Sequence, residues 1–331
     1  MDKNGQLTFS DDPLLNKKNE SIQAMREGDF TNAVKLLDEL LSINPDYPGL
    51  IESYRTAKFW MNRQQELISL NEGKETAQFL MEEWEEFETY AQNKEMQNSM
   101  SYQATMHYIF YKASENYKTA FQNNEDTSNN FTLLLNLGSC FLRLEEYSFT
   151  IDTLEYARSS YTTNAKLLFI LAEAYYQNKE IPKSLVLFKE AFIIDSSQLD
   201  LSIIKSKAIT DLVALIKKQR QGSYDVREWI PVYGYVEDVF YVRKNINKHQ
   251  VQTLNSEIYN LEINFQRMNS DEINETNILP RLINKYLWML DYYEFQKYSF
   301  EDLAEIRDRL LRLEPHIFEE YFKNNSIRRE F

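Results

Sequence analysis

The side chains that most often perform chemistry in proteins are few in this chain and lie far apart. It has three histidines and one cysteine: His107, His249, His316 and Cys140. A metal site needs several Cys, His or carboxylate ligands at short spacing, and a nucleophilic cysteine needs a base close to it. The sequence places neither arrangement around these four residues. We therefore predict no catalytic residue, no metal ion and no cofactor, and we do not expect an enzyme.

One run of carboxylates is dense enough to bind a cation or a basic partner. Residues 81–88 read MEEWEEFE and contain five glutamates. Leu80, Trp84 and Phe87 recur there at helical spacing and define one apolar face. The glutamates are therefore interpreted as the solvated side of an amphipathic helix, and binding of a basic partner is the alternative. Their spacing does not resemble a calcium-binding loop.

The composition favours helices and disfavours two kinds of partner. The 331 residues include only 7 Gly and 7 Pro, too few for the many turns of an all-β protein. The net charge of −14 would repel the phosphates of nucleic acid. No apolar run is long enough to span a membrane, and the opening residues lack the pattern of a secretory signal. We expect a cytoplasmic protein with protein partners, and a homo-oligomer is possible.

The chain contains an internal repeat with a period of 34 residues. Residues 131–163 align with residues 165–197, and the matched positions are Leu137 with Leu171, Gly138 with Ala172, Phe141 with Tyr175, Leu154 with Phe188, and Ala157 with Ala191. Such a period is typical of helical hairpins that stack into a solenoid. Small residues let the helices of a hairpin approach closely, and the aromatic residues fill the space beside them.

These hairpins resemble tetratricopeptide (TPR) repeats. Residues 13–46 add a third segment of this type, with Gly-Asp-Phe at 28–30, Ala33, and a closing Asn-Pro-Asp at 44–46. The repeats at 131–163 and 165–197 lack the closing proline of the family pattern. The resemblance implies a non-enzymatic scaffold whose concave groove holds a partner peptide or helix. The Asn-rich and Tyr-rich composition of the repeats is also similar to that of TPR proteins of spirochaete bacteria, some of which build collars around flagellar motors.

The predicted architecture is all-α, with a TPR-like solenoid followed by a smaller helical region. We expect a flexible tail at 1–12, a solenoid at 13–220 and an aromatic-rich helical region at 224–331, divided at Gln221-Gly222-Ser223. Residues 229–236 contain Pro231 and Gly234, so a continuous helix is not expected there. The other expected helices are 13–27, 31–42, 49–68, 74–92, 101–121, 198–220, 247–268, 279–295, 300–313 and 315–324.

The groove is expected on the first helix of each repeat, as the resemblance implies. Its predicted residues are Leu135, Ser139, Leu142 and Arg143 from one repeat, and Lys166, Phe169, Glu173, Tyr176 and Gln177 from the next. Arg143 and Lys166 are suited to a carboxylate, and Phe169 and Tyr176 to apolar contacts. The alternative is that another part of the same chain fills the groove.

Two further functional hypotheses concern the C-terminal region. One is a structural subunit of a larger bacterial assembly, such as a flagellar-motor collar, that docks through this region. The other is an enzyme with its active site in 224–331. The exposure of six aromatic residues in this region distinguishes the adaptor hypothesis from the subunit hypothesis. Burial within one chain favours the adaptor, and a large exposed patch favours a permanent interface. The six residues are Trp229, Tyr233, Tyr235, Trp288, Tyr292 and Tyr293.

Overall fold

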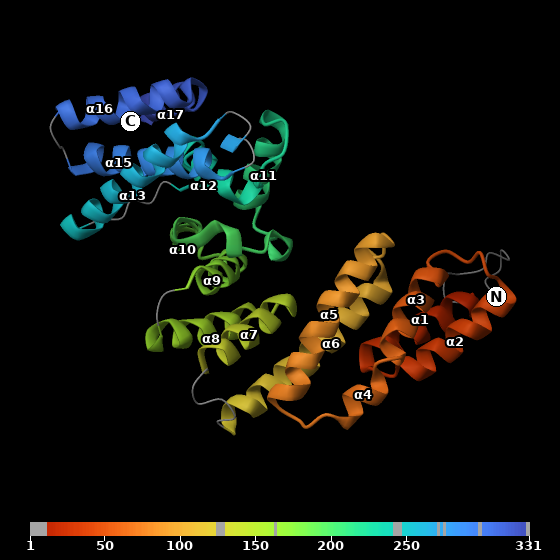
Figure 1. The fold of residues 1–331 in the computed structure, drawn as a ribbon. Coiled ribbons are helices and arrows are strands. Elements are labelled where there is room, and N and C mark those ends of the chain that lie inside the picture. Colours follow the sequence, from red (N-terminus) through yellow and green to blue (C-terminus); the bar gives the residue numbers. More distant parts are fainter. Residues whose placement is uncertain are drawn as a thin grey trace. The chain divides into compact units, whose positions relative to one another are not determined.

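The computed structural model describes residues 12–123, 130–161, 164–240, 247–269, 272–273, 276–296 and 300–328. Every regular element in these residues is a helix (Figure 1), so the predicted all-α class is confirmed. Residues 1–11 of the predicted tail lie outside the described residues. The chain divides into two compact units, Met1–Tyr161 and Thr162–Phe331.

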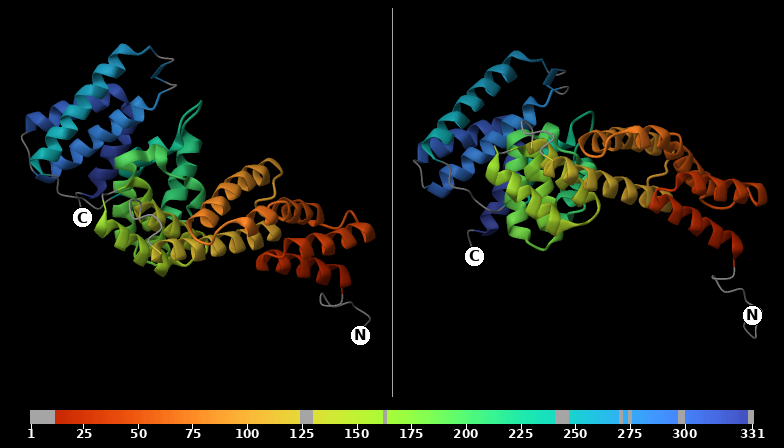
Figure 2. Two further views of the ribbon diagram at one scale, coloured as in Figure 1. Left: turned by 60° about the horizontal axis from the view of Figure 1, so that its bottom comes forward. Right: turned by 90° about the horizontal axis from the view of Figure 1, so that it is seen from below.

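The first unit is organised around the long helix α6. Its helices are α1 (Pro13–Glu27), α2 (Phe30–Ile43), α3 (Leu50–Met61), α4 (Gln64–Ser69), α5 (Lys74–Asn93), α6 (Met100–Gln122), α7 (Asn130–Arg143) and α8 (Tyr147–Ser160). α6 packs against α1, α3, α5 and α7, and Figure 2 shows α5 and α6 side by side. The core between them is aromatic: Trp84 contacts Phe110 and Tyr102 with ring centroids 5.1 and 5.3 Å apart. Burial of such large rings is a major stabilising contribution.

Side-chain caps fix the starts of several helices in this unit. Asp12 accepts a hydrogen bond from the backbone N–H of Leu14 at 2.9 Å, directly before the Pro13 that opens α1. The Asp29 and Ser99 side chains cap α2 and α6 in the same way. Such caps satisfy N–H groups that have no partner inside the helix. The Asp12 cap explains why α1 begins at Pro13, as the predicted helix 13–27 does.

Three helical hairpins share one turn geometry. α1–α2, α7–α8, and α9–α10 (Ala165–Gln177 and Ile181–Asp195) each turn at a left-handed residue, namely Gly28, Glu145 or Lys179, with φ of 82°, 63° and 69°. The next backbone N–H then bonds to the carbonyl five residues earlier: Asp29 to Ala24 at 2.8 Å, Glu146 to Phe141 at 2.9 Å and Glu180 to Tyr175 at 2.9 Å. These bonds define a Schellman motif. The two predicted 34-residue repeats therefore form hairpins with the same turn at the predicted shift.

The second unit surrounds the helix α12. After α9 and α10 come two 3₁₀ turns, η2 (Ser196–Gln198) and η3 (Leu201–Ile203), then α11 (Lys207–Gln219), α12 (Val226–Val236), α13 (Lys248–Arg267), α15 (Ile278–Gln296), α16 (Phe300–Leu313) and α17 (Pro315–Arg328). α12 packs against α10, α11, α15 and α17. The helices α13 and α15–α17 lie together in both views of Figure 2. They agree with the predicted helices 247–268, 279–295, 300–313 and 315–324, the last of which ends four residues later.

The expectation that residues 229–236 do not form a continuous helix is wrong. They belong to α12, although Pro231 removes one backbone hydrogen bond from its interior, a loss of about 3 kcal/mol. All residues from 228 to 236 are buried, and each large apolar side chain contributes about 1.5–3 kcal/mol when buried. Gly234 has a packing role, because a Cβ there would lie 2.3 Å from the Phe240 ring. Tertiary packing therefore outweighs the local preference.

Two expected helices are interrupted. In the range 198–220 only α11 is α-helical, because the Asp195 and Asp200 side chains accept the N–H groups of Ser197 and Ser202 and form tight turns. Such local bonds compete with helix formation. The range 49–68 divides into α3 and α4 at residues 62–63, where the Arg63 side chain forms ion pairs with Glu83 and Glu86 of α5.

The predicted division at 221–223 lies inside the second unit. It separates α11 from α12, and these two helices pack on each other. The division by packing falls between Tyr161 and Thr162 instead. In the part of the chain that the structure describes, no helix combines the length and apolar character needed to cross a bilayer.

Candidate functional site

The predicted groove residues lie on two helices that belong to different units. Leu135, Ser139, Leu142 and Arg143 are on α7 of the first unit, and Lys166, Phe169, Glu173, Tyr176 and Gln177 are on α9 of the second.

The α7 residues are largely engaged in contacts of the first unit. Leu135 and Leu142 are buried, and Ser139 is half-buried. The Arg143 guanidinium lies 3.6 Å from a carboxylate oxygen of Glu88 and 5.7 Å from the centre of the Phe110 ring. Arg143 is thus already paired with a carboxylate of its own chain.

The α9 residues are partly covered by the segment before α11. Glu173 is only 1% exposed, and its carboxylate accepts hydrogen bonds from the backbone N–H groups of Lys205 and Ser206 at 3.0 and 3.3 Å. Phe169 is also 1% exposed and packs on the rings of Phe188 and Phe192. At Glu173 the chain itself therefore occupies the predicted groove face, which is the alternative that the sequence left open.

Three predicted groove residues on α9 keep surface that a partner can contact. Lys166 is exposed, and Tyr176 and Gln177 are half-buried. The Gln177 side chain also donates a hydrogen bond to Glu173 at 2.7 Å. These residues form the remaining candidate contact face of α9.

The C-terminal aromatic residues are mostly inside the second unit. Trp229, Tyr233, Tyr235 and Tyr292 are at most 6% exposed, and Trp288 and Tyr293 are half-buried. They therefore do not form a large exposed aromatic patch.

A cavity of about 550 Å³ lies in the second unit, outside the predicted groove. Its walls come from the end of α10 with η2, and from α12, α13 and α15. The lining combines charged side chains with apolar ones, among them Ile194 and Leu261. Ligand sites in proteins are commonly concave, with apolar walls and a few polar groups.

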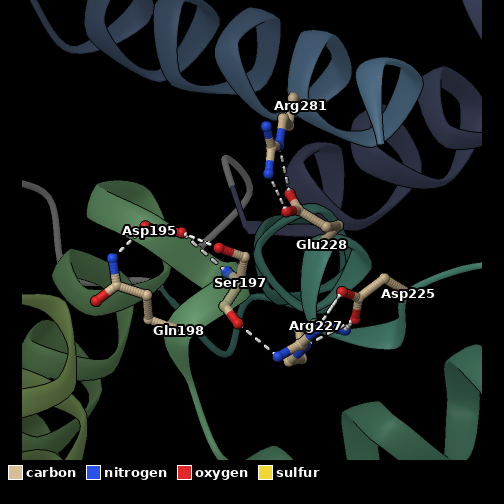
Figure 3. A network of polar contacts seen from close by, with 7 residues as sticks. All are labelled: Asp195, Ser197, Gln198, Asp225, Arg227, Glu228 and Arg281. Atoms are coloured by element: carbon tan, nitrogen blue, oxygen red, sulfur yellow. Dashed lines mark hydrogen bonds and ion pairs between the residues drawn. The ribbon is translucent and has the colours of Figure 1, made fainter. Parts of the chain in front are cut away.

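An ion pair between the exposed Arg281 of α15 and the buried Glu228 of α12 lines this cavity. The Glu228 side chain is only 3% exposed, and both of its oxygens accept hydrogen bonds from Arg281, at 3.0 Å from Nε and 2.5 Å from Nη2 (Figure 3). The bond to Glu228 raises the pKa of the Arg281 guanidinium. A two-point pair of this kind fixes the orientation of both side chains. Glu228 is thereby neutralised by Arg281.

The end of α10 contributes a carboxylate to the same cavity. Asp195 accepts hydrogen bonds from the Ser197 N–H and hydroxyl and from the Gln198 amide, at 3.1, 2.5 and 2.6 Å (Figure 3). These bonds, that of the Ser197 hydroxyl above all, lower the pKa of Asp195, so it is charged at neutral pH. Arg227 bonds to the Ser197 carbonyl and to Asp225 and holds η2 next to α12.

One buried polar atom of the cavity has no hydrogen-bond partner in the described structure. Asn284 of α15 is 7% exposed and lines the cavity, and its Oδ1 atom is buried without a donor. A buried acceptor without a donor lowers stability by about 1–3 kcal/mol. Asn284 Oδ1 is one of twelve buried side-chain atoms in the described residues that lack a hydrogen-bond partner, whereas buried polar groups are nearly always satisfied.

The cavity residues were not found from the sequence, and little in the sequence reveals them. Arg281, Asn284 and Lys285 share one face of α15 at helical spacing, which is the only local pattern. Asp195 and Glu228 precede Arg281 by 86 and 53 residues. In the sequence, Glu228 has the pattern of a solvent-exposed helix residue, whereas the structure buries its side chain.

Other sites for chemistry are not apparent in the described residues. No group of three His, Cys, Asp or Glu side chains there has the arrangement to hold a metal ion. Cys140 is fully buried, and burial raises the pKa of its thiol. Such a thiol is a poor nucleophile because its thiolate form is disfavoured.

Comparison with known proteins gives no relative from which a function can be transferred. No family model matches the chain, and no curated protein or solved structure is significantly similar to it. The TPR resemblance therefore rests on the sequence alone.

Proposed function

We propose that this protein is a non-enzymatic, protein-binding scaffold built from TPR-like helical hairpins. The observation that carries this proposal is that the two 34-residue repeats turn at equivalent positions, Glu145 and Lys179, with a left-handed residue and a five-residue backward hydrogen bond in each. Repeated hairpins of one geometry are the building units of solenoids that bind partners on an extended surface. The cytoplasm is its proposed location.

The proposed contact face on the second unit is that of Lys166, Tyr176 and Gln177 on α9. Tyr176 is the proposed anchor, because tyrosine offers a large contact area at little conformational entropy. Phe169 and Glu173 are assigned to the protein's own core and not to the partner. The partner is a peptide or helix, as for the groove predicted above.

Most of the negative charge lies on the first unit, whereas the α9 contact face belongs to the second unit, which is nearly balanced in charge. Residues 1–161 contain 26 acidic and 14 basic side chains, a formal charge of −12, whereas residues 162–331 contain 25 and 23, a charge of −2. A one-sided field of this kind attracts partners of opposite charge and is weakened by salt.

Quantitative binding to a captured partner tests this function. The tagged full chain is used to isolate a partner, whose affinity is then measured for the wild type, Tyr176→Ala and Tyr259→Ala. Tyr259 of α13 is a matched control, because it is 64% exposed and lies outside the α9 face. We expect Tyr176→Ala to weaken binding by about 2 kcal/mol, roughly 30-fold, with the fold intact, and Tyr259→Ala to leave it unchanged. Equal affinities for all three proteins would contradict the proposed face.

A further inference from the structure

We propose that α8 carries a docking surface for an arginine-bearing segment of a partner protein, formed by the aromatic rings of Phe149 and Tyr156 and the carboxylate of Asp152. These three residues belong to the first unit, whereas the α9 contact face belongs to the second. The proposal therefore does not depend on the function proposed above.

The two rings lie exposed on one side of α8. Phe149 is 57% exposed and Tyr156 is 55% exposed, although both are large and aromatic. Their spacing of two helical turns places them on one helix face, about 10 Å apart along the axis. Each ring contacts a second ring: Phe149 that of Phe141 and Tyr156 that of Phe121, with centroids 5.6 and 6.4 Å apart. These contacts hold the rings in place, so ordering them on binding costs little conformational entropy.

A carboxylate lies between the two rings on the same face. Asp152 is exposed and follows Phe149 by one helical turn, as Tyr156 follows Asp152. Residues three and four apart are neighbours on a helix surface. Among the described residues, no basic side chain bonds to Asp152, whereas Arg158, the base of this helix, is paired with Glu155 at 3.6 Å. Asp152 is therefore available to a basic group of a partner.

The order of ring, carboxylate and ring matches the chemistry of arginine. Its planar guanidinium stacks on an aromatic face and can donate two parallel hydrogen bonds to a carboxylate. The first unit already contains such an arrangement: the Arg63 guanidinium lies 3.5 Å from the centre of the Phe59 ring and is paired with Glu83. Lysine is a poorer match, because its ammonium is a compact and strongly hydrated charge.

Charge complementarity extends beyond the three side chains. Residues 145–160, the turn before α8 and the helix itself, contain four acidic residues and one basic residue. The whole first unit has a formal charge of −12. Such a field attracts a basic segment and repels an acidic one. An acidic partner, or a second copy of this acidic chain, is therefore a poor occupant.

Titration of the full chain with labelled peptides, followed by fluorescence anisotropy, tests the surface. The probe consists of four repeats of Ala-Arg-Ala, and peptides with lysine or glutamate in place of arginine are the comparisons. We expect the arginine peptide to bind with a Kd of about 0.1 mM or tighter, and at least about threefold more tightly than the lysine peptide. Its binding should weaken as salt is added. The glutamate peptide should not bind.

Two variants and two matched controls connect this binding to α8. Phe149→Leu/Tyr156→Leu keeps apolar side chains in the helix but removes both rings, and it should weaken binding of the arginine peptide about tenfold. Asp152→Asn removes the charge at nearly constant size and should weaken it at least about threefold. Glu85→Gln removes one charge at an exposed position of α5 in the same unit, and Tyr259→Leu removes an exposed ring of the second unit. Both controls should bind as the wild type does.

The proposal is overturned if the arginine peptide does not bind, or if the lysine peptide binds equally well. It is also overturned if Glu85→Gln weakens binding as much as Asp152→Asn, because the acidic unit would then attract the peptide without a defined site. Sedimentation of the full chain covers the remaining occupant. Self-association that is lost in Phe149→Leu/Tyr156→Leu would make a second copy the occupant and would contradict the proposal.

Discussion

Gly138 of α7 faces Leu154 of α8 so closely that a methyl group at position 138 would lie 2.5 Å from the Leu154 Cδ2 atom. The contact joins the two helices of one hairpin. At the 34-residue shift the corresponding residues are Ala172 and Phe188 on α9 and α10. The small residue predicted from the sequence to let the helices touch therefore has that role in the first of the two hairpins.

We expect Gly138→Leu to lower the free energy of unfolding by at least about 1–3 kcal/mol, because the added side chain has no space against Leu154. Urea denaturation followed by circular dichroism measures the change. Leu154→Ala in the same chain should restore part of the loss, since it removes the clashing atoms. An unchanged transition in Gly138→Leu would show that the α7–α8 contact is wrong.

Replacement of the non-glycine turn residues by glycine should stabilise the protein. Glu145 and Lys179 have positive φ although neither is glycine, and this conformation is strained for side chains with a Cβ. Glu145→Gly and Lys179→Gly should each raise the free energy of unfolding by roughly 0.5–1 kcal/mol. Asp152→Gly in the middle of α8 is the matched control, and it should lower stability by about 0.5–1 kcal/mol.

At Gly28, the equivalent turn residue of the α1–α2 hairpin, substitution should lower stability. It has φ of 82°, and a Cβ there would lie 2.2 Å from the Tyr108 ring of α6. Gly28→Ala should therefore be destabilising by more than about 1 kcal/mol. A thermal melt that is unchanged, or raised, would contradict the packing of α1 on α6.

Cys140 should be unreactive in the folded protein. It is fully buried on α7, and burial raises the pKa of its thiol, so little thiolate is present for reaction. Ellman's reagent should titrate less than a tenth of the thiol in native protein within minutes, and the whole of it in denaturant. Rapid labelling without denaturant would show that this part of the first unit is open to solvent.

Stability should decline in alkaline solution because of buried tyrosines. Burial raises the pKa of Tyr102, Tyr117 and Tyr286 above the ordinary value near 10. Below that pH these phenols are neutral in both the folded and the unfolded chain, and stability is unaffected. Above it, they ionise readily only when unfolded, so the free energy of unfolding falls as pH rises.

Absorbance of phenolate at 295 nm measures this difference. Native protein should show a group of tyrosines that ionise only together with unfolding, beyond the ordinary titration of the exposed ones. Full titration near pH 10 without unfolding would contradict their burial.

Helix positions were largely predictable because they depend on local patterns. The Asp12-Pro13 start and the apolar period of 13–27 determine α1, and the 34-residue shift locates both hairpins. Prediction failed where distant contacts decide. α12 forms despite Pro231 because its residues are buried on all sides, and the α3–α4 break coincides with the Arg63 ion pairs to α5.

The candidate cavity was beyond sequence prediction for a related reason. Asp195, Glu228 and Asn284 come from three helices. Only their burial and their contacts in the folded chain distinguish them from other polar residues. The predicted groove illustrates the same limit, because the segment at residues 205–206 that covers Glu173 follows it by more than 30 residues.

The most direct test of the proposed scaffold is photocrosslinking from position 176 in native cells. A photoreactive phenylalanine analogue replaces Tyr176 in one variant and the exposed Tyr259 in a control. A partner on the α9 face predicts one protein crosslinked from position 176 and not from position 259. Crosslinks to the same protein from both positions, or from position 259 alone, would contradict the account.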